Sequence, residues 1–414
     1  MKKTTKKIIA LLWAAGLIVG GTTGCTAQSP EETTAATTPA AETAANAETT
    51  VSADTTASEE TAETAEAAPS EESGIGTLYQ PNFKIEKLSD GIKRVTDGDG
   101  RELILVPKSL GEIPAEYADS TVITTPVRNA VFLSSTQVCT FRTASDSAIL
   151  DGIGGVSGSA ASWSDIPGIA ERMEHGQIVD VMGSSDMGEP DYEKIQALEP
   201  DVVFVYTGEY GQQAAIAKLE ELGINYAVDN EYLEDSYLAR MEWMRFLLTF
   251  FNADDTADSI MANVQANVDA AKEKTAGLEK PTVAIFNVYD GTVYITREGG
   301  WTGTMIDDMG GVNAFAGIAD STLTLEAAYD AVLDADVIIY SSSPMYCSGL
   351  PAILDQFPQL TECKAYENNR IYQHDDSYWN GIDQTDIMAC DLAAILYPEA
   401  FPNRTLTYYI KLEK

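Results

Sequence analysis

Hydrophobic and polar positions repeat in two similar blocks of the chain. The first block, residues 191–205, reads DYEKIQALEPDVVFV: a short helical pattern, a Pro-Asp hinge, and a run of β-branched and aromatic residues typical of a buried strand. The second block, residues 323–343, reads LTLEAAYDAVLDADVIIYSSS and ends in a similar strand. Each strand opens with an aspartate, Asp201 or Asp336. The repetition predicts two similar α/β lobes.

Short strands alternate with helical and glycine-rich stretches on both sides of a long helical segment. NAVFLSS and DGIGGVSGSAASW begin this alternation after Val127, and it resumes after Pro281. Between them, residues 237–251 are apolar at helical spacing, and residues 253–277 carry Asp and Glu early and Lys late, as the helix dipole favours. In the part before the long helical segment, this alternation predicts a largely parallel sheet covered by helices.

The predicted fold class is α/β, with two Rossmann-like lobes joined by a long rigid helix and a small N-terminal β extension. Residues 82–106 alternate β-prone runs with DG turns, which predicts two or three antiparallel strands in this extension. The expected segments are a signal peptide (1–24), a disordered tether (25–75), the β extension (76–125), an N-terminal lobe (126–252), a connecting helix (253–280) and a C-terminal lobe (281–414).

The N-terminus has the pattern of an export signal. It combines a basic start, an apolar run from Ile8 to Gly21 and small residues before Cys25. The end of this run, Thr22-Thr23-Gly24-Cys25, resembles the lipobox of bacterial lipoproteins, with Thr22 in place of the usual Leu. This resemblance implies lipidation of Cys25 and an extracytoplasmic protein anchored to the cell membrane. Ordinary cleavage, with Cys25 lost or free, is the alternative.

The composition excludes several classes of partner and site. Of the 64 acidic residues, only 11 lie in residues 26–74, an Ala/Thr/Glu-rich tether, so the remaining chain is itself strongly acidic and unsuited to nucleic acid. The chain has only two histidines, His175 and His374, too few for three-histidine zinc coordination. Four cysteines follow the tether without zinc-site spacing; one disulfide in the C-terminal third is an option, with the pairing left open: Cys139, Cys347, Cys363 and Cys390.

An enzyme is not expected. The sequence GGVSGSA at 154–160 lacks the final glycine of a GxSxG nucleophile turn and is more simply a ligand loop. There is no phosphate-binding or dinucleotide fingerprint, and adjacent acids such as Asp307-Asp308 are expected at this composition. No cofactor is predicted.

Four features follow one another along residues 126–400: LEPDVVFVYTGEYGQQAAIAKLEELGIN, the 253–277 helix, GGWTGTMIDDMGGVNAFAG and NNRIYQHDDSYWNG. In this order they resemble the class of periplasmic binding proteins that serves ABC importers of cobalamin, ferric siderophores and haem. In that family a surface Glu on each lobe pairs with permease arginines. Glu193 and Glu326 match those positions; the alternative is that both are ordinary solvated acids at helix starts.

Ligands of open α/β sheets bind at the carboxyl ends of the strands. The loops expected there contribute aromatic side chains suited to a flat macrocycle or aryl chelate, unless each ring packs under its own loop. The candidate ligand-binding residues are Trp163, Tyr206, Tyr210, Arg297, Trp301, Tyr346 and Trp379.

The loop chemistry ranks the ligands that the resemblance implies. Arg297 is the only basic residue in these loops, which favours a weakly charged corrinoid, followed by a ferric siderophore of low charge. Haem comes third, with Tyr346 or His374 as axial ligand, although a hydrogen-bonded loop histidine is the simpler interpretation of His374. A non-transport surface adhesin on the same tether is a further alternative. The expected partners are thus a metal chelate, an ABC permease and, through the lipid, the membrane.

Overall fold

The computed structural model describes residues 79, 81–182, 189–209 and 211–414. Three predictions lie outside these residues: the signal peptide, the tether with Cys25, and Tyr210. None of the helices in the described ranges combines the length and apolar character that a membrane span needs.

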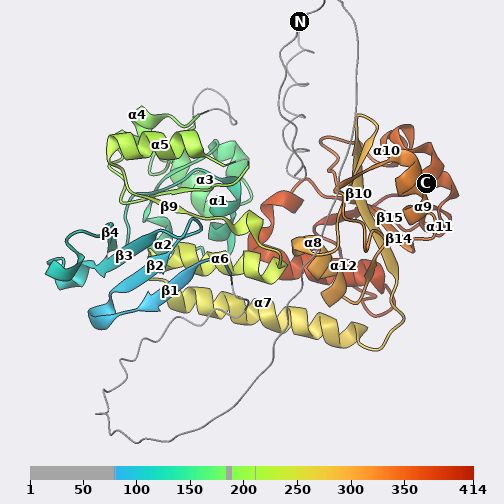
Figure 1. Cartoon of the computed structure of the whole chain (residues 1–414), viewed down its shortest axis with the longest axis horizontal. Coiled ribbons are helices and arrows are strands. Elements are labelled where there is room, and N and C mark those ends of the chain that lie inside the picture. Colours follow the sequence, from blue (N-terminus) through green and yellow to red (C-terminus); the bar gives the residue numbers. More distant parts are fainter. Residues whose placement is uncertain (1–78, 80, 183–188, 210) are drawn as a thin grey trace, which may run out of the picture. The chain divides into compact units, whose positions relative to one another are not determined.

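A four-stranded sheet begins the described chain (Figure 1). Three antiparallel strands match the two or three expected around residues 82–106, and a fourth strand of the predicted β extension pairs in parallel: β1 Lys84–Lys87, β2 Lys93–Thr96, β3 Glu102–Pro107 and β4 Val122–Thr125. Alternate residues of this sheet, including Ile85, Val95 and Leu103, belong to the same apolar core as the next lobe. The sheet therefore packs into the protein's core.

The N-terminal lobe holds a five-stranded, wholly parallel sheet in the order β7-β6-β5-β8-β9. Its strands are short, all except β7 are buried, and Phe132 of β5 stacks on Phe204 of β8 at 4.8 Å between ring centroids. The bounds are β5 Ala130–Phe132, α1 Ser135–Thr143, α2 Ser147–Leu150, β6 Ile153–Val156, α3 Pro167–Glu174, β7 Val179–Asp180, α4 Tyr192–Ala197, β8 Val203–Val205, α5 Gln213–Leu222 and β9 Tyr226–Val228.

The C-terminal lobe has a mixed sheet in the order β13-β11-β10-β14-β15-β16, with β12 also paired to β10. Strands β10, β14 and β15 are parallel, whereas β11, β13 and β16 pair antiparallel. The bounds are β10 Thr282–Tyr289, β11 Thr292–Ile295, α8 Gly300–Asp308, β12 Val312–Asn313, β13 Thr322–Thr324, α9 Leu325–Val332, β14 Val337–Tyr340, α10 Leu350–Gln356, α11 Lys364–Glu367, β15 Ile371–His374, α12 Thr385–Leu396 and β16 Tyr409–Lys411.

Two helices link these sheets, α6 (Tyr237–Thr249) and α7 (Asp254–Thr275), the long yellow helix in Figure 1. Asn252, with a φ of 54°, lies in the break between them. All 13 residues of α6 are buried, because it packs against α7, α8 and α12. The α/β fold class with two lobes and a long connecting helix is thus confirmed, while the domain boundaries stay a prediction.

Candidate functional site

Trp163, the first candidate ligand residue, is packed beneath its own loop. The ring is buried, and its indole N–H donates to the carbonyl oxygen of Ser157 at 2.9 Å. Because both the ring and its polar handle are occupied by the protein, the packing alternative describes this residue better than a ligand contact.

Trp301 and Trp379 lie next to each other in the structure. Their ring centroids lie 6.3 Å apart, edge to face, and both rings are half-buried. Gly299 and Gly300 have φ values of 77° and 72°, a conformation that favours glycine and that places Trp301 in the first turn of α8. Arg240 of α6 lies over the Trp301 ring, 4.7 Å from its centroid.

His374 is not the hydrogen-bonded loop histidine that was predicted. It is the last residue of β15, it is buried, and among the described residues neither ring nitrogen has a hydrogen-bond partner. The ring stacks on Tyr378 at 3.5 Å between centroids. Burial lowers the pKa of His374 to about 3, so the ring is neutral at physiological pH. Since the ring is enclosed, it is not available as an axial ligand.

The other candidate residues lie at strand ends with different exposure. Tyr206 follows β8, is half-buried, and meets Tyr232 edge to face at 5.8 Å. Tyr346 follows β14 and is 36% exposed. Arg297 is exposed, but it follows β11, which runs antiparallel to β10, so it does not follow the carboxyl end of a parallel strand as was expected from the sequence.

Two exposed apolar side chains in these loops were not among the candidate ligand-binding residues predicted from the sequence. Leu233, after β9, is 49% exposed, and Met345, after β14, is 68% exposed. Their only sequence signal is an apolar residue inside an otherwise polar loop, DNEYLED or SSSPMYC. Both follow carboxyl ends of parallel strands, where a ligand is expected.

Arg142 of α1 connects two of the candidate loops. Its guanidinium donates to Asp165 at 2.7 Å, to the carbonyl oxygen of Asn380 at 3.1 Å, and to Asp383. The Thr143 hydroxyl donates to the other Asp383 oxygen at 2.6 Å. Burial raises the pKa of Asp383 to about 6, although Arg142 and Thr143 oppose the rise. We call this group the Arg142 clasp; it fixes the loop of Trp163 against the loop of Trp379.

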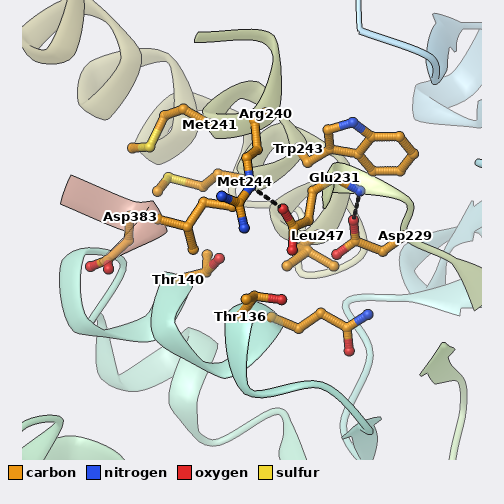
Figure 2. A pocket seen from close by; sticks show the side chains of 12 residues that line it. Thr136, Thr140, Asp229, Glu231, Arg240, Met241, Trp243, Met244, Leu247 and Asp383 are labelled. Carbon is orange, nitrogen blue, oxygen red and sulfur yellow. Dashed lines mark hydrogen bonds and ion pairs between the residues drawn. The ribbon is translucent and has the colours of Figure 1, made fainter. Parts of the chain in front are cut away.

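A small hollow lies between α1, α6 and the segment after β9 (Figure 2). Arg240 donates to Glu231 at 2.5 Å, and the Glu231 backbone N–H donates to one oxygen of Asp229 at 3.2 Å. The other Asp229 oxygen has no hydrogen-bond partner among the described residues. Burial, reinforced by Glu231, raises the pKa of Asp229 well above its ordinary value. The hollow is small enough that it suits one water molecule and not a chelate.

The two candidate docking glutamates occupy equivalent places. Glu193 lies in the first turn of α4 and Glu326 in the first turn of α9, and both are exposed. Each helix start is capped by the side chain of its own N-cap residue, Asp191 or Thr324, which accepts a backbone N–H at 3.1 or 3.2 Å. Neither glutamate is therefore needed as the cap.

The cysteines and the possible metal-ligating side chains are the remaining candidate groups. All four described cysteines are free and buried, so the C-terminal disulfide left open by the sequence is not formed. Within the described ranges, no group of three or more His, Cys, Asp or Glu side chains is placed to hold a metal ion.

Comparison with known proteins agrees with this architecture. Residues 146–378, more than half of the chain, match the family model described as periplasmic binding protein. Uncharacterized lipoprotein MJ0878 of Methanocaldococcus jannaschii is 30% identical over 303 residues, which cover 70% of each chain.

Two solved structures share the fold at low sequence identity. A periplasmic solute binding protein from Veillonella parvula has a TM-score of 0.53 at 19% identity, covering 76% of this chain and 89% of that one. The periplasmic heme-binding protein RhuT from Roseiflexus has a TM-score of 0.51 at 19% identity, covering 66% and 99%. Two lobes, a long connecting helix and the matched family model together show that the chain belongs to the periplasmic binding protein family.

Proposed function

We propose that the protein captures a metal chelate of low charge, a corrinoid or a ferric siderophore, and delivers it to an ABC permease. The observation that carries the proposal is the half-buried pair Trp301 and Trp379, of which Trp379 follows the carboxyl end of the parallel strand β15. Exposed Leu233 and Met345 add apolar contact area in the loops of both lobes. Such rigid rings and apolar rims suit a large, mostly apolar ligand.

The charge of the loops supports a ligand without many negative charges. Arg240 faces Trp301 but is already paired with Glu231, which leaves Arg297 as the exposed base of the candidate residues. Acids are close by: Asp376 accepts the backbone N–H of Met345 at 3.0 Å. A polyanionic catecholate chelate would therefore meet more repulsion than attraction.

Haem is the second candidate, supported by the heme-binding proteins among the structural neighbours. With His374 enclosed, Tyr346 remains of the two axial ligands predicted from the sequence. Iron binding by a tyrosine requires the phenolate, and burial together with Asp376 raises the pKa of Tyr346. That direction opposes haem ligation and keeps haem behind the corrinoid.

Calorimetric titration of the full chain with cyanocobalamin, a ferric hydroxamate, a ferric catecholate and haemin tests the proposal. We expect saturable binding of cyanocobalamin or the hydroxamate with little dependence on salt. Trp301→Ala and Trp379→Ala should each weaken it by about 1.5–3 kcal/mol, the value of one large buried apolar side chain. Trp163→Phe is the matched control, because that ring is already enclosed by its loop.

The outcomes separate the alternatives. Binding of haemin alone, lost in Tyr346→Phe, would favour the haem receptor. Binding of the catecholate alone, weakened by salt and by Arg297→Ala, would reject a low-charge ligand. An absence of binding to all four probes would favour the adhesin.

Delivery to a permease is proposed to depend on Glu193 and Glu326, and membrane attachment on a lipid at Cys25. The exposure of both glutamates and the lipoprotein name of the M. jannaschii relative support these two points. An extracytoplasmic location follows from the family.

A further inference from the structure

A turn of the N-terminal sheet, Asp97 to Arg101, is locked into one shape by its own first residue. The Asp97 carboxylate is buried and accepts the backbone N–H groups of Asp99 at 3.1 Å and Arg101 at 2.9 Å. These two charge-assisted hydrogen bonds lie within the turn, so they stabilise its conformation independently of contacts with the rest of the protein.

This turn covers the free edge of the five-stranded sheet. The edge strand is β9, and the Gly98 N–H donates to the Val228 carbonyl oxygen at 2.9 Å. In return, the Val228 N–H donates to Asp97 at 3.1 Å. A Cβ on Gly98 would lie 2.9 Å from Asn230, so only glycine fits this approach.

The turn also reaches Thr207, the second residue after β8. The Thr207 hydroxyl donates to Asp99 at 2.5 Å and accepts from Asn230 at 2.8 Å. The Thr207 N–H donates to Asn230 at 2.9 Å, and the Thr207 carbonyl oxygen accepts from the Tyr232 hydroxyl. All hydrogen-bonding groups of this residue are therefore engaged.

We infer that the 97–101 turn positions the ligand loop after β8, with Asp99 as a positioning residue for Tyr206; this inference rests on the proposed function. Tyr206 precedes Thr207 directly, and Gly208, with a φ of 100°, follows it. Glycine gives that loop conformational freedom, which the bonds to Thr207 remove. A loop held in its binding conformation avoids the entropic cost of ordering when a ligand binds.

Amide hydrogen exchange of the full chain tests the inference in Asp99→Ala, Asp99→Asn and the control Asp119→Ala. Asp119 is an exposed acid on the same extension. The reporting amides are Thr207 and Gln212, which donates to the Tyr206 carbonyl oxygen at 2.8 Å. We expect exchange about tenfold faster in Asp99→Ala, because a hydrogen bond to a charged group is lost. Asp99→Asn keeps an acceptor and should restore most of the protection.

Cyanocobalamin affinity, measured on the same variants, should fall by about the same factor in Asp99→Ala and remain unchanged in Asp119→Ala. Unchanged exchange at Thr207 and Gln212 in Asp99→Ala would overturn the inference. So would faster exchange at these amides together with unchanged affinity for cyanocobalamin. If the wild type binds none of the four probes, the proposed ligand fails, and the exchange result still decides whether the turn holds the loop.

Discussion

The enclosure of the His374 ring can be tested quantitatively. The surrounding side chains that the structure describes accommodate a neutral imidazole but offer nothing that would stabilise a protonated one. Tyr378 stacks on one face, and Trp379 and Tyr409 contact the ring edge-on at centroid distances of 5.9 and 5.6 Å. Neither ring nitrogen has a partner among the described residues that could stabilise a proton. Protonating His374 in the folded state would therefore bury an unpaired charge.

The magnitude follows from the two pKa values. In the unfolded chain the pKa of the histidine is about 6.5, and in the folded protein burial lowers it to about 3. Between these values the unfolded chain binds the proton and the folded protein does not, so stability falls as pH falls. At about 1.4 kcal/mol per pKa unit, lowering the pH from about 7.5 to 4 removes about 3 kcal/mol.

Denaturant unfolding at both pH values isolates this contribution. His374→Phe keeps a flat ring for stacking on Tyr378 but cannot titrate, so its free energy of unfolding should fall by about 3 kcal/mol less than that of the wild type. Other titrating groups cancel in this difference. Equal pH responses in His374→Phe and wild type would refute the enclosure of the ring.

Two further predictions concern the surface and the interior. Glu193→Arg combined with Glu326→Arg should leave chelate affinity unchanged and abolish uptake by cells; normal uptake would reject the docking assignment. Arg142→Ala should lower the free energy of unfolding by about 3–5 kcal/mol, because buried Asp383 loses its partner. Arg172→Ala, which breaks the more exposed ion pair with Asp151, should cost about 1 kcal/mol or less, and an equal loss in both variants would contradict the clasp.

The features that the sequence predicted well depend on local patterns. Helix starts such as those of α4 and α9 are set by their own N-cap residues, and buried strands such as β8 and β14 by runs of β-branched and aromatic residues. Both signals lie within about ten residues of chain. The repeated order of such elements was therefore enough to predict two lobes.

The contacts around the candidate site could not be predicted, because they join residues that are distant in sequence. Arg142 and Asp383 are separated by 241 positions, and Asp99 and Thr207 by 108. The periodic pattern of apolar and polar residues gives no information on pairs that are so far apart in sequence. The enclosure of Trp163 and His374 likewise depends on which side chains of other elements cover each ring. A loop aromatic looks the same in sequence whether it faces a ligand or the core.

Helix α6 limits how far ligand capture can move the two lobes. Tyr237 of α6 donates to Asp308 at 2.8 Å, and Arg240 covers Trp301, so one buried helix contacts α8 of the C-terminal lobe twice. Separating α6 from α8 would also expose apolar side chains at about 1.5–3 kcal/mol each. We therefore expect capture to involve small displacements around loops already held in place. Under this expectation, the conformation of each loop matters more for affinity than a large closure does, and residues such as Asp99 become as important as the rings that contact the chelate.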